Sequence, residues 1–197
     1  MKICVFCASS ETIDKAYIKT AEDFGRALAA NGDSLVFGAG KYGLMGAVAR
    51  GVRQNGGSAV GVIPRFFGTI DVMFTDCEII KTDSMRERKH IMEDTADAFV
   101  MLPGGIGTFE EFFEILTLKQ LGRHKKPIAV YNLRGYYDSL LSFLEQSIAE
   151  GFMSREVLSL FYVSDNMEQI FAYLKKGDSY TYNKYNFLED EDGKDKL

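Results

Sequence analysis

The sequence contains few cysteines and histidines and no long hydrophobic run, and each shortage excludes a class of protein. Three cysteines among 197 residues are an odd number and too few for a disulfide framework. Only His90 and His124 are present, and neither has the spacing of a metal ligand, so we predict no metal site and no cofactor. No apolar run approaches the roughly 18 residues of a membrane span. The opening run MKICVFCASS is too short for a signal peptide, which indicates a cytoplasmic protein without membrane contact.

An excess of positive charge is also missing. The formal net charge is −5, which leaves no bulk attraction for nucleic acid or for acidic membranes, so we predict no nucleic-acid partner. A local basic cluster could still hold a single phosphate group. The length of 197 residues is enough for one domain with a full core and short for two.

Short apolar runs alternate with amphipathic stretches along the chain. The predicted strands are Ile3–Cys7, Ser34–Phe37, Ala59–Ile63, Cys77–Lys81, Ala98–Leu102, Ile128–Tyr131 and a weaker one at Phe161–Val163. The predicted helices are Asp14–Ala30, Leu44–Gln54, Met85–Thr95, Phe109–Leu121, Tyr136–Glu150 and Met167–Lys175. Repeated strand–helix units, with strands apolar on both faces, predict an α/β fold: a Rossmann-like, doubly wound, mainly parallel sheet with helices on both faces. We expect one domain over 1–180 and a charged, flexible tail over 181–197.

Two local features permit more than one interpretation. Cys4 and Cys7 match a CxxC motif, but residues three apart in a strand point to opposite faces, so we predict two separate core thiols. The irregular stretch Pro64–Thr75 is rich in phenylalanine and is either a loop over a site or a subunit contact.

A glycine-rich segment follows the second predicted strand. Gly38, Gly40 and Gly43 match GxGxxG, and such glycines let backbone N–H groups approach a phosphate at a helix N-terminus. The acidic residue that a dinucleotide site needs at the tip of the next strand is missing, and Tyr42 stands where a P-loop needs Ser or Thr. The segment is therefore either a phosphate or ribose loop, or a set of tight turns.

A second glycine-rich segment, PGGIGTFEE at Pro103–Glu111, follows the predicted strand Ala98–Leu102 and opens a helix. This position lies at the carboxyl edge of the sheet, where such folds bind ligands. Thr108 and Glu111 also fit a helix-capping box, which alone would explain both residues. A cap does not require three glycines, so we predict a phosphate-binding loop.

A buried arginine is the third candidate. Met85, Arg88 and Met92 fall on one face of a predicted helix. Burying an arginine within an apolar stripe costs free energy unless the guanidinium pairs with a carboxylate or a phosphate. The alternative interpretation is that Arg88 forms an Arg–Glu ion pair on the surface. Ser84 and Glu87 form a capping box at the start of this helix.

Together these elements resemble the Lonely guy family of cytokinin riboside 5′-monophosphate phosphoribohydrolases, whose members are often labelled lysine decarboxylases. Its PGGxGTxxE motif is met from Pro103 to Glu111, and its M-x-x-R-K motif by Met85, Arg88 and Lys89. The shorter matches are CVFCxSS at 4–10, GLMG at 43–46 and LGxxxKP at 121–127, and the resemblance extends to about residue 163.

The resemblance implies hydrolysis of the N-glycosidic bond in nucleoside 5′-monophosphates, with N6-substituted AMP or AMP as substrate, by a homodimer. It implies catalytic roles for Arg88 and Glu111. The residues that it implies for substrate binding are Ser9, Gly40, Met85, Lys89, Gly104, Gly105, Gly107, Thr108 and Thr117. No pattern supports a pyridoxal phosphate lysine, so decarboxylation is not predicted.

The chain departs from the family pattern at three positions. Ala8 and Ala39 replace family glycines, and Phe66 stands where many members have an acidic residue, which leaves the base preference open. Two alternative functions also remain open: a general purine or pyrimidine nucleotide nucleosidase, and a non-catalytic nucleotide-binding or carrier protein. A single-stranded DNA-binding protein is a more distant alternative, because the chain lacks an aromatic–basic stripe.

Overall fold

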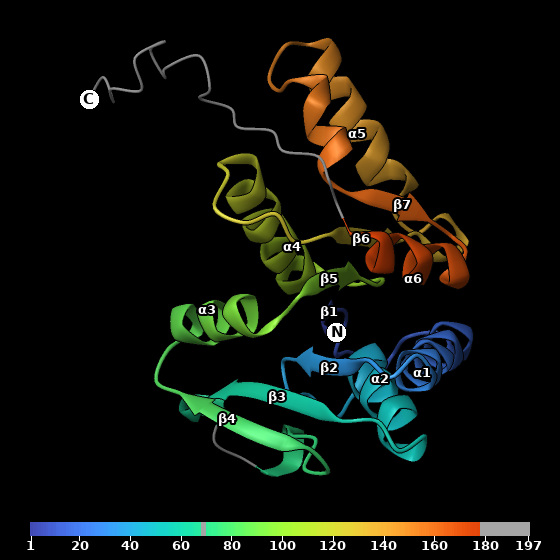
Figure 1. Ribbon diagram of the computed structural model, residues 1–197, viewed down its shortest axis with the longest axis vertical. Helices are drawn as coiled ribbons and strands as arrows, with labels where there is room; N and C mark the ends of the chain where they lie inside the picture. Colours follow the sequence, from blue (N-terminus) through green and yellow to red (C-terminus); the bar gives the residue numbers. More distant parts are fainter. Residues whose placement is uncertain (68–69, 178–197) are drawn as a thin grey trace.

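The strands form one parallel sheet. The computed structural model describes residues 1–67 and 70–177, and within them seven strands pair in the order β4-β3-β2-β1-β5-β6-β7 (Figure 1). Every pairing is parallel. The strands are β1 Lys2–Phe6, β2 Ser34–Phe37, β3 Ala59–Pro64, β4 Glu78–Thr82, β5 Ala98–Met101, β6 Ile128–Tyr131 and β7 Tyr162–Ser164. The predicted α/β class and the predicted strands are confirmed. The predicted tail at 181–197 lies outside the described residues.

Helices cover both faces of this sheet. The α-helices are α1 Lys15–Ala30, α2 Gly43–Gln54, α3 Met85–Thr95, α4 Ile106–Gln120, α5 Asp138–Ala149 and α6 Met167–Lys176. Short 3-10 turns are η1 Arg65–Phe67, η2 Ile70–Val72, η3 Leu133–Gly135 and η4 Arg155–Leu160. Helices α1, α2 and α6 lie on one side of the sheet and α3, α4 and α5 on the other (Figure 1). This is the doubly wound, Rossmann-like arrangement that the sequence predicts.

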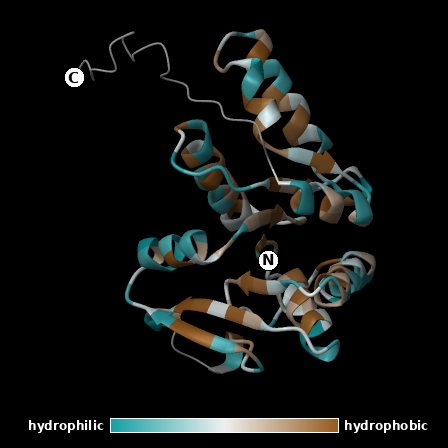
Figure 2. Ribbon diagram, viewed as in Figure 1, coloured by the Kyte–Doolittle hydropathy of each residue, from teal (hydrophilic) through white to brown (hydrophobic). Residues whose placement is uncertain are grey.

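Apolar side chains of the strands supply two cores, one on each face of the sheet. Figure 2 shows the strands as the most hydrophobic segments and the outer helix faces as hydrophilic. Cys7 belongs to the core beneath α1, α2 and α6, whereas Cys4 belongs to the core beneath α3, α4 and α5. The two thiols therefore lie on opposite faces of the sheet, as predicted, and both are free and buried.

Two helix starts differ from the prediction. Helix α4 begins at Ile106, three residues before the predicted start, with Gly105 at its N-cap. The capping box predicted at Thr108 and Glu111 is therefore wrong, because Thr108 already lies inside the first turn. Helix α5 begins at Asp138, since Arg134 and Gly135 take positive φ values of 57° and 71° and make a separate turn.

Candidate active site

The candidate site lies at the carboxyl edge of the sheet, beside β1, where the order of the strands changes direction. β1 pairs with β2 on one side and with β5 on the other, so the loops after β1 and β5 diverge here and leave a crevice. Backbone hydrogen bonds fix these loops: Ala8 N donates to Pro103 O at 3.1 Å, and Met45 N donates to Ala8 O at 3.1 Å. The loops after β1, β2 and β5 are thus one connected structure.

A buried ion pair lies next to this crevice. Arg88 Nη1 on α3 donates to Glu111 Oε1 on α4 at 3.0 Å, and each side chain is only 9% exposed. Arg88 Nε donates to the carbonyl of Val62 on β3 at 3.0 Å. The predicted burial of Arg88 on the face that carries Met92 is confirmed, and a surface Arg–Glu pair is excluded.

The capping box predicted for α3 fixes where this arginine lies. Ser84 Oγ accepts a hydrogen bond from Glu87 N at 3.1 Å, and Glu87 Oε2 accepts one from Asp83 N at 2.7 Å. The helix therefore begins at Met85, and Arg88 follows one turn later on the inner face.

The electrostatic state of Glu111 reflects two opposing effects. Burial raises the pKa of the Glu111 carboxyl above its ordinary value, and the charge and hydrogen bond of Arg88 oppose that rise. The carboxylate therefore depends on the guanidinium for its ionised form. A carboxylate fixed in this way beside a ligand crevice can stabilise developing positive charge.

The remaining face of Arg88 borders a cavity of about 350 Å³. Ser9, Gly38 and Gly40 line it on the side of Arg88. A Cβ on Gly38 would lie 1.9 Å from Arg88 Nη2, so only glycine leaves room for the guanidinium here. The other wall is mainly apolar and consists of Tyr42, Met45, Ile63, Pro64, Phe67 and Val72.

The loop at 64–75 supplies part of this apolar wall. Lys41 N donates to Val72 O at 3.0 Å and Phe74 N donates to Ala39 O at 2.8 Å, which attaches the loop to the glycine-rich segment after β2. The described residues Phe67 and Val72 thus line the cavity beside Arg88, which agrees with the interpretation as a loop over the site; the alternative of a subunit contact is not tested by a single chain. Ala39, which replaces a family glycine, has a φ of 60° in the left-handed region.

Of the three glycines in the PGGIG loop, only Gly104 is required by packing within the chain. A Cβ on Gly104 would lie 2.1 Å from Thr108 Oγ1, whereas one on Gly105 or Gly107 would meet nothing within 4 Å. Gly105 and Gly107 are exposed, and Thr108 is buried at 4% exposure. Packing within the chain therefore does not explain Gly105 and Gly107, and their open N–H groups at the start of α4 suit an anion.

Two tyrosines that the sequence analysis missed support this loop. Tyr136 OH donates to Gly104 O at 3.0 Å, and the buried Tyr137 OH donates to Leu102 O at 2.7 Å. Both tyrosines follow the turn after β6 and therefore lie at the carboxyl edge of the sheet, like the PGGIG loop after β5. This position in the predicted strand order is the sequence feature that could have identified them.

The other predicted binding residues lie at different distances from the crevice. Met85 is 36% exposed at the start of α3. Lys89 Nζ contacts Glu110 Oε1 and lies 2.8 Å from Glu114 Oε2, both on α4. Thr117 does not join the cavity of its own chain, since it lines a separate hollow beside Phe152. Six residues along a helix place Thr117 about 120° around the helix axis from Glu111.

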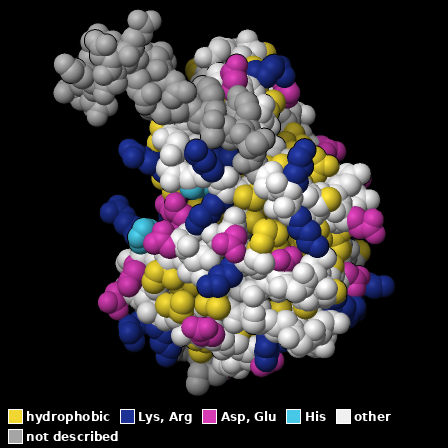
Figure 3. Space-filling model, in the orientation of Figure 1, with side chains coloured by type: hydrophobic (Ala, Val, Ile, Leu, Met, Phe, Trp, Pro, Cys, Tyr) yellow, Lys and Arg dark blue, Asp and Glu magenta, His cyan; other side chains and the backbone are white. Residues whose placement is uncertain are grey.

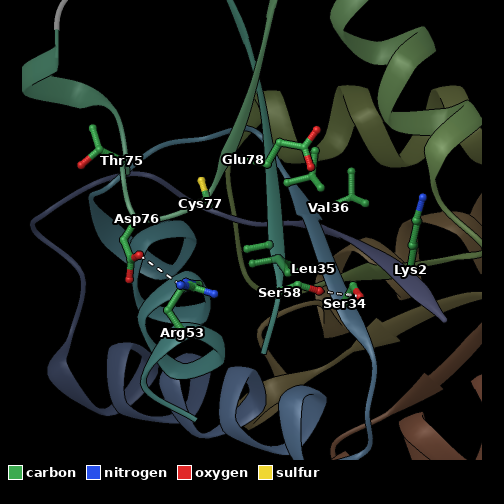
Figure 4. A pocket seen from close by; sticks show the side chains of 12 residues that line it. Lys2, Ser34, Leu35, Val36, Arg53, Ser58, Thr75, Asp76, Cys77 and Glu78 are labelled. Carbon is green, nitrogen blue, oxygen red and sulfur yellow. Dashed lines mark hydrogen bonds and ion pairs between the residues drawn. The ribbon is translucent and has the colours of Figure 1, made fainter. Parts of the chain in front are cut away.

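A larger hollow of about 580 Å³ lies at the opposite edge of the sheet, among the amino ends of β1 to β4 (Figure 4). Four of its polar side chains pair with one another: Ser58 Oγ donates to Ser34 Oγ at 2.8 Å, and Arg53 lies 3.2 Å from Asp76. Parallel α/β sheets bind ligands at their carboxyl edge, so the smaller cavity beside Arg88 is the stronger candidate despite its size.

Within residues 1–67 and 70–177, no group of three or more His, Cys, Asp or Glu residues is placed to hold a metal ion. No helix in this part of the chain has the length and apolar character that crossing a membrane requires.

Comparisons with solved structures identify the fold. A molybdenum cofactor binding protein from Rippkaea orientalis superposes with a TM-score of 0.68 at 19% identity, over 89% of this chain and 95% of that one. The Moco carrier protein of Chlamydomonas reinhardtii gives a TM-score of 0.66 at 20% identity, over 89% and 95%. At such low identity these matches show a shared fold and nothing about ligands.

Sequence comparisons are more specific. The family model described as possible lysine decarboxylase matches residues 45–174. The probable cytokinin riboside 5′-monophosphate phosphoribohydrolase LOGL3 of Oryza sativa subsp. japonica is 43% identical, over 78% of this chain and 73% of its own length. LOG2 of Arabidopsis thaliana, which carries the same enzyme name, is 37% identical over 89% and 83%. This chain therefore belongs to the family of cytokinin riboside 5′-monophosphate phosphoribohydrolases.

Proposed function

We propose that this chain hydrolyses the N-glycosidic bond of nucleoside 5′-monophosphates, with N6-substituted AMP and AMP as its candidate substrates. The products are the free base and ribose 5-phosphate. The buried pair of Arg88 and Glu111 beside the crevice carries the proposal. A protein that only binds nucleotides needs the glycine loops, but it has no need of a carboxylate kept ionised inside the fold by an arginine.

The reaction breaks the bond between the base and C1′ of the ribose, and positive charge develops on the sugar as the base leaves. An adjacent carboxylate stabilises such an oxocarbenium-like state. In this proposal Glu111 has that role, holding the ribose hydroxyls or orienting the attacking water. Arg88 lowers the pKa of Glu111 against the effect of burial, and its side chain also lines the cavity.

The 5′-phosphate is assigned to the start of α4. The N–H groups of Gly105, Gly107 and Thr108 lie in the first turn, where the helix dipole favours an anion. Gly104 shapes the loop through its contact with Thr108. Ser9 and Gly40 line the neighbouring cavity and are assigned to the ribose or the base.

The apolar wall of the cavity supports a substituted base. Met45, Phe67 and Val72 line this wall, which suits the hydrocarbon part of an N6 substituent. Acidic and basic side chains are interspersed on the face shown in Figure 3. That distribution suits a small nucleotide better than a long polyanion.

We also propose a cytoplasmic homodimer. The three free thiols of each chain suit a reducing compartment. Phe143 on α5 is 61% exposed, and Phe152, which lines the hollow that contains Thr117 and Met153, is 81% exposed. Exposed aromatic rings of this size on one side of a chain are typical of a subunit contact. Size-exclusion chromatography with light scattering would detect the doubled mass, and a purely monomeric protein would contradict this part of the proposal.

A panel of nucleoside monophosphates tests the function. Ribose 5-phosphate release is measured from isopentenyl-AMP, AMP, IMP, CMP and UMP, with nucleotide binding measured in parallel by calorimetry. Fastest release from isopentenyl-AMP supports the proposal. Comparable release from many bases indicates a general nucleosidase instead. Binding without release from any nucleotide indicates a carrier protein, an activity that this fold also accommodates.

A further inference from the structure

Helix α3 is joined to helix α4 by polar contacts. Of its 11 residues only Arg88 and Met92 are buried. Arg88 binds Glu111 and the carbonyl of Val62, and Lys89 binds Glu110 and Glu114. Met92 and Ile91 pack α3 onto the core of the sheet, and the ion pairs of Arg88 and Lys89 connect the helix to α4.

We propose that Lys89 is a positioning residue that acts through Glu110 and Glu114: it fixes α3 against α4 and so keeps Arg88 on Glu111. This role replaces the substrate contact that the family resemblance implies for Lys89. It rests on the proposed function, since it concerns the same reaction.

The contacts form two adjacent layers between the helices. Arg88 and Glu111 make the inner layer, and the next residue on α3, Lys89, makes the outer layer with Glu110 and Glu114. The Lys89 side chain is 17% exposed, while those of Glu110 and Glu114 are 51% and 40% exposed, so the ammonium group lies between the helices beneath its partners. Two of its three N–H donors are thereby occupied.

The same contacts influence the charge state of Glu111. The charged groups that face it are Arg88 and Lys89 from α3 and Glu110 from its own helix. Lys89 lowers the pKa of Glu111, and Glu110 raises it. The Cys4 thiol on β1 and the Cys7 thiol just after β1 also sense the charge of Glu111; burial raises the pKa of both thiols, so they stay neutral. Removal of Lys89 therefore leaves Glu110 without its counter-charge, and the pKa of Glu111 rises further.

The test is a carbon-13 NMR titration of the Glu111 carboxyl group, which requires no enzymatic activity. Lys89→Met should raise the pKa of Glu111. The double variant Lys89→Met with Glu110→Gln should return it toward the wild-type value, and Lys89→Arg should leave it near that value. Arg26→Met is the matched control, because Arg26 also bridges two carboxylates, Glu22 and Asp23, but on α1.

Kinetics separate a positioning role from substrate contact. We expect Lys89→Met to lose about fivefold more kcat near pH 5 than near pH 8, with KM little changed.

Should Lys89→Met fail to fold, Glu110→Gln alone should lower the pKa of Glu111. An unmoved Glu111 titration in both variants, or a raised KM at every pH, would overturn the proposal. A wild-type protein that cleaves no nucleotide would refute the proposed function, and the titration would still decide the role of Lys89.

Discussion

Breaking the Arg88–Glu111 pair should have a large effect that depends on pH. Arg88→Met leaves the Glu111 carboxylate buried without a counter-charge and the Val62 carbonyl without its side-chain donor. Removing one partner of a buried ion pair typically costs about 3–5 kcal/mol. Because native proteins are stable by only about 5–15 kcal/mol, Arg88→Met should lose a large part of its free energy of unfolding at neutral pH.

The pH dependence follows from the carboxyl group. Glu111 already has a raised pKa in the folded protein, and the loss of Arg88 raises it further. A carboxyl group with a raised folded-state pKa contributes its full stability below the unfolded pKa and loses it as pH rises through the folded pKa. The destabilisation of Arg88→Met should therefore be smaller near pH 5 than near pH 8.

Urea unfolding followed by circular dichroism at both pH values measures this. The double variant Arg88→Met with Glu111→Leu should recover most of the lost stability, since an apolar pair replaces the ion pair. Equal destabilisation of Arg88→Met at the two pH values, or a double variant as unstable as the single one, would refute the electrostatic account.

Three further substitutions test the loops. Gly104→Ala should destabilise the protein by about 1–3 kcal/mol, because its Cβ would lie 2.1 Å from Thr108 Oγ1. Gly107→Ala, which meets nothing, should leave thermal stability unchanged or slightly raised and still increase KM; an unchanged KM would argue against phosphate binding there. Ala39→Gly should change the free energy of unfolding by less than about 0.5 kcal/mol. Glycine relieves the backbone strain at a φ of 60°, and this offsets the conformational entropy that glycine adds to the unfolded chain. A loss of more than about 1 kcal/mol would mean that Ala39 is not strained.

The sequence predicts the sheet well because its strands are apolar on both faces. Runs such as CVFC and AFVM match only a sheet covered on two sides, and the structure places them at its centre. The burial of Arg88 was predictable for a similar reason, since an arginine in an apolar stripe needs a partner. That partner proved to be Glu111 on α4, the next α-helix along the chain, and the spacing of residues within α3 gives no sign of it.

Other parts of the site depend on tertiary contacts that local sequence does not reveal. The start of α4 at Ile106 was missed because Gly-Ile-Gly is a weak helix former, and the loop before it is held by Tyr136 and Tyr137 from a distant turn. The cavity wall at Phe67 and Val72 has no periodic pattern to predict it. The resemblance assigned Thr117 to the same pocket, but the helical period places it elsewhere in its own chain.

The central claim is that Glu111 stabilises the cleavage of a nucleotide's N-glycosidic bond. The most direct test is ribose 5-phosphate release from isopentenyl-AMP by the wild-type protein, Glu111→Gln and the matched control Glu145→Gln, whose carboxylate pairs with Arg155 on the surface. We predict that Glu111→Gln lowers kcat by about 10²–10⁴-fold with folding and nucleotide binding retained, and that the control is unaffected. Turnover by Glu111→Gln at the wild-type rate would contradict the account.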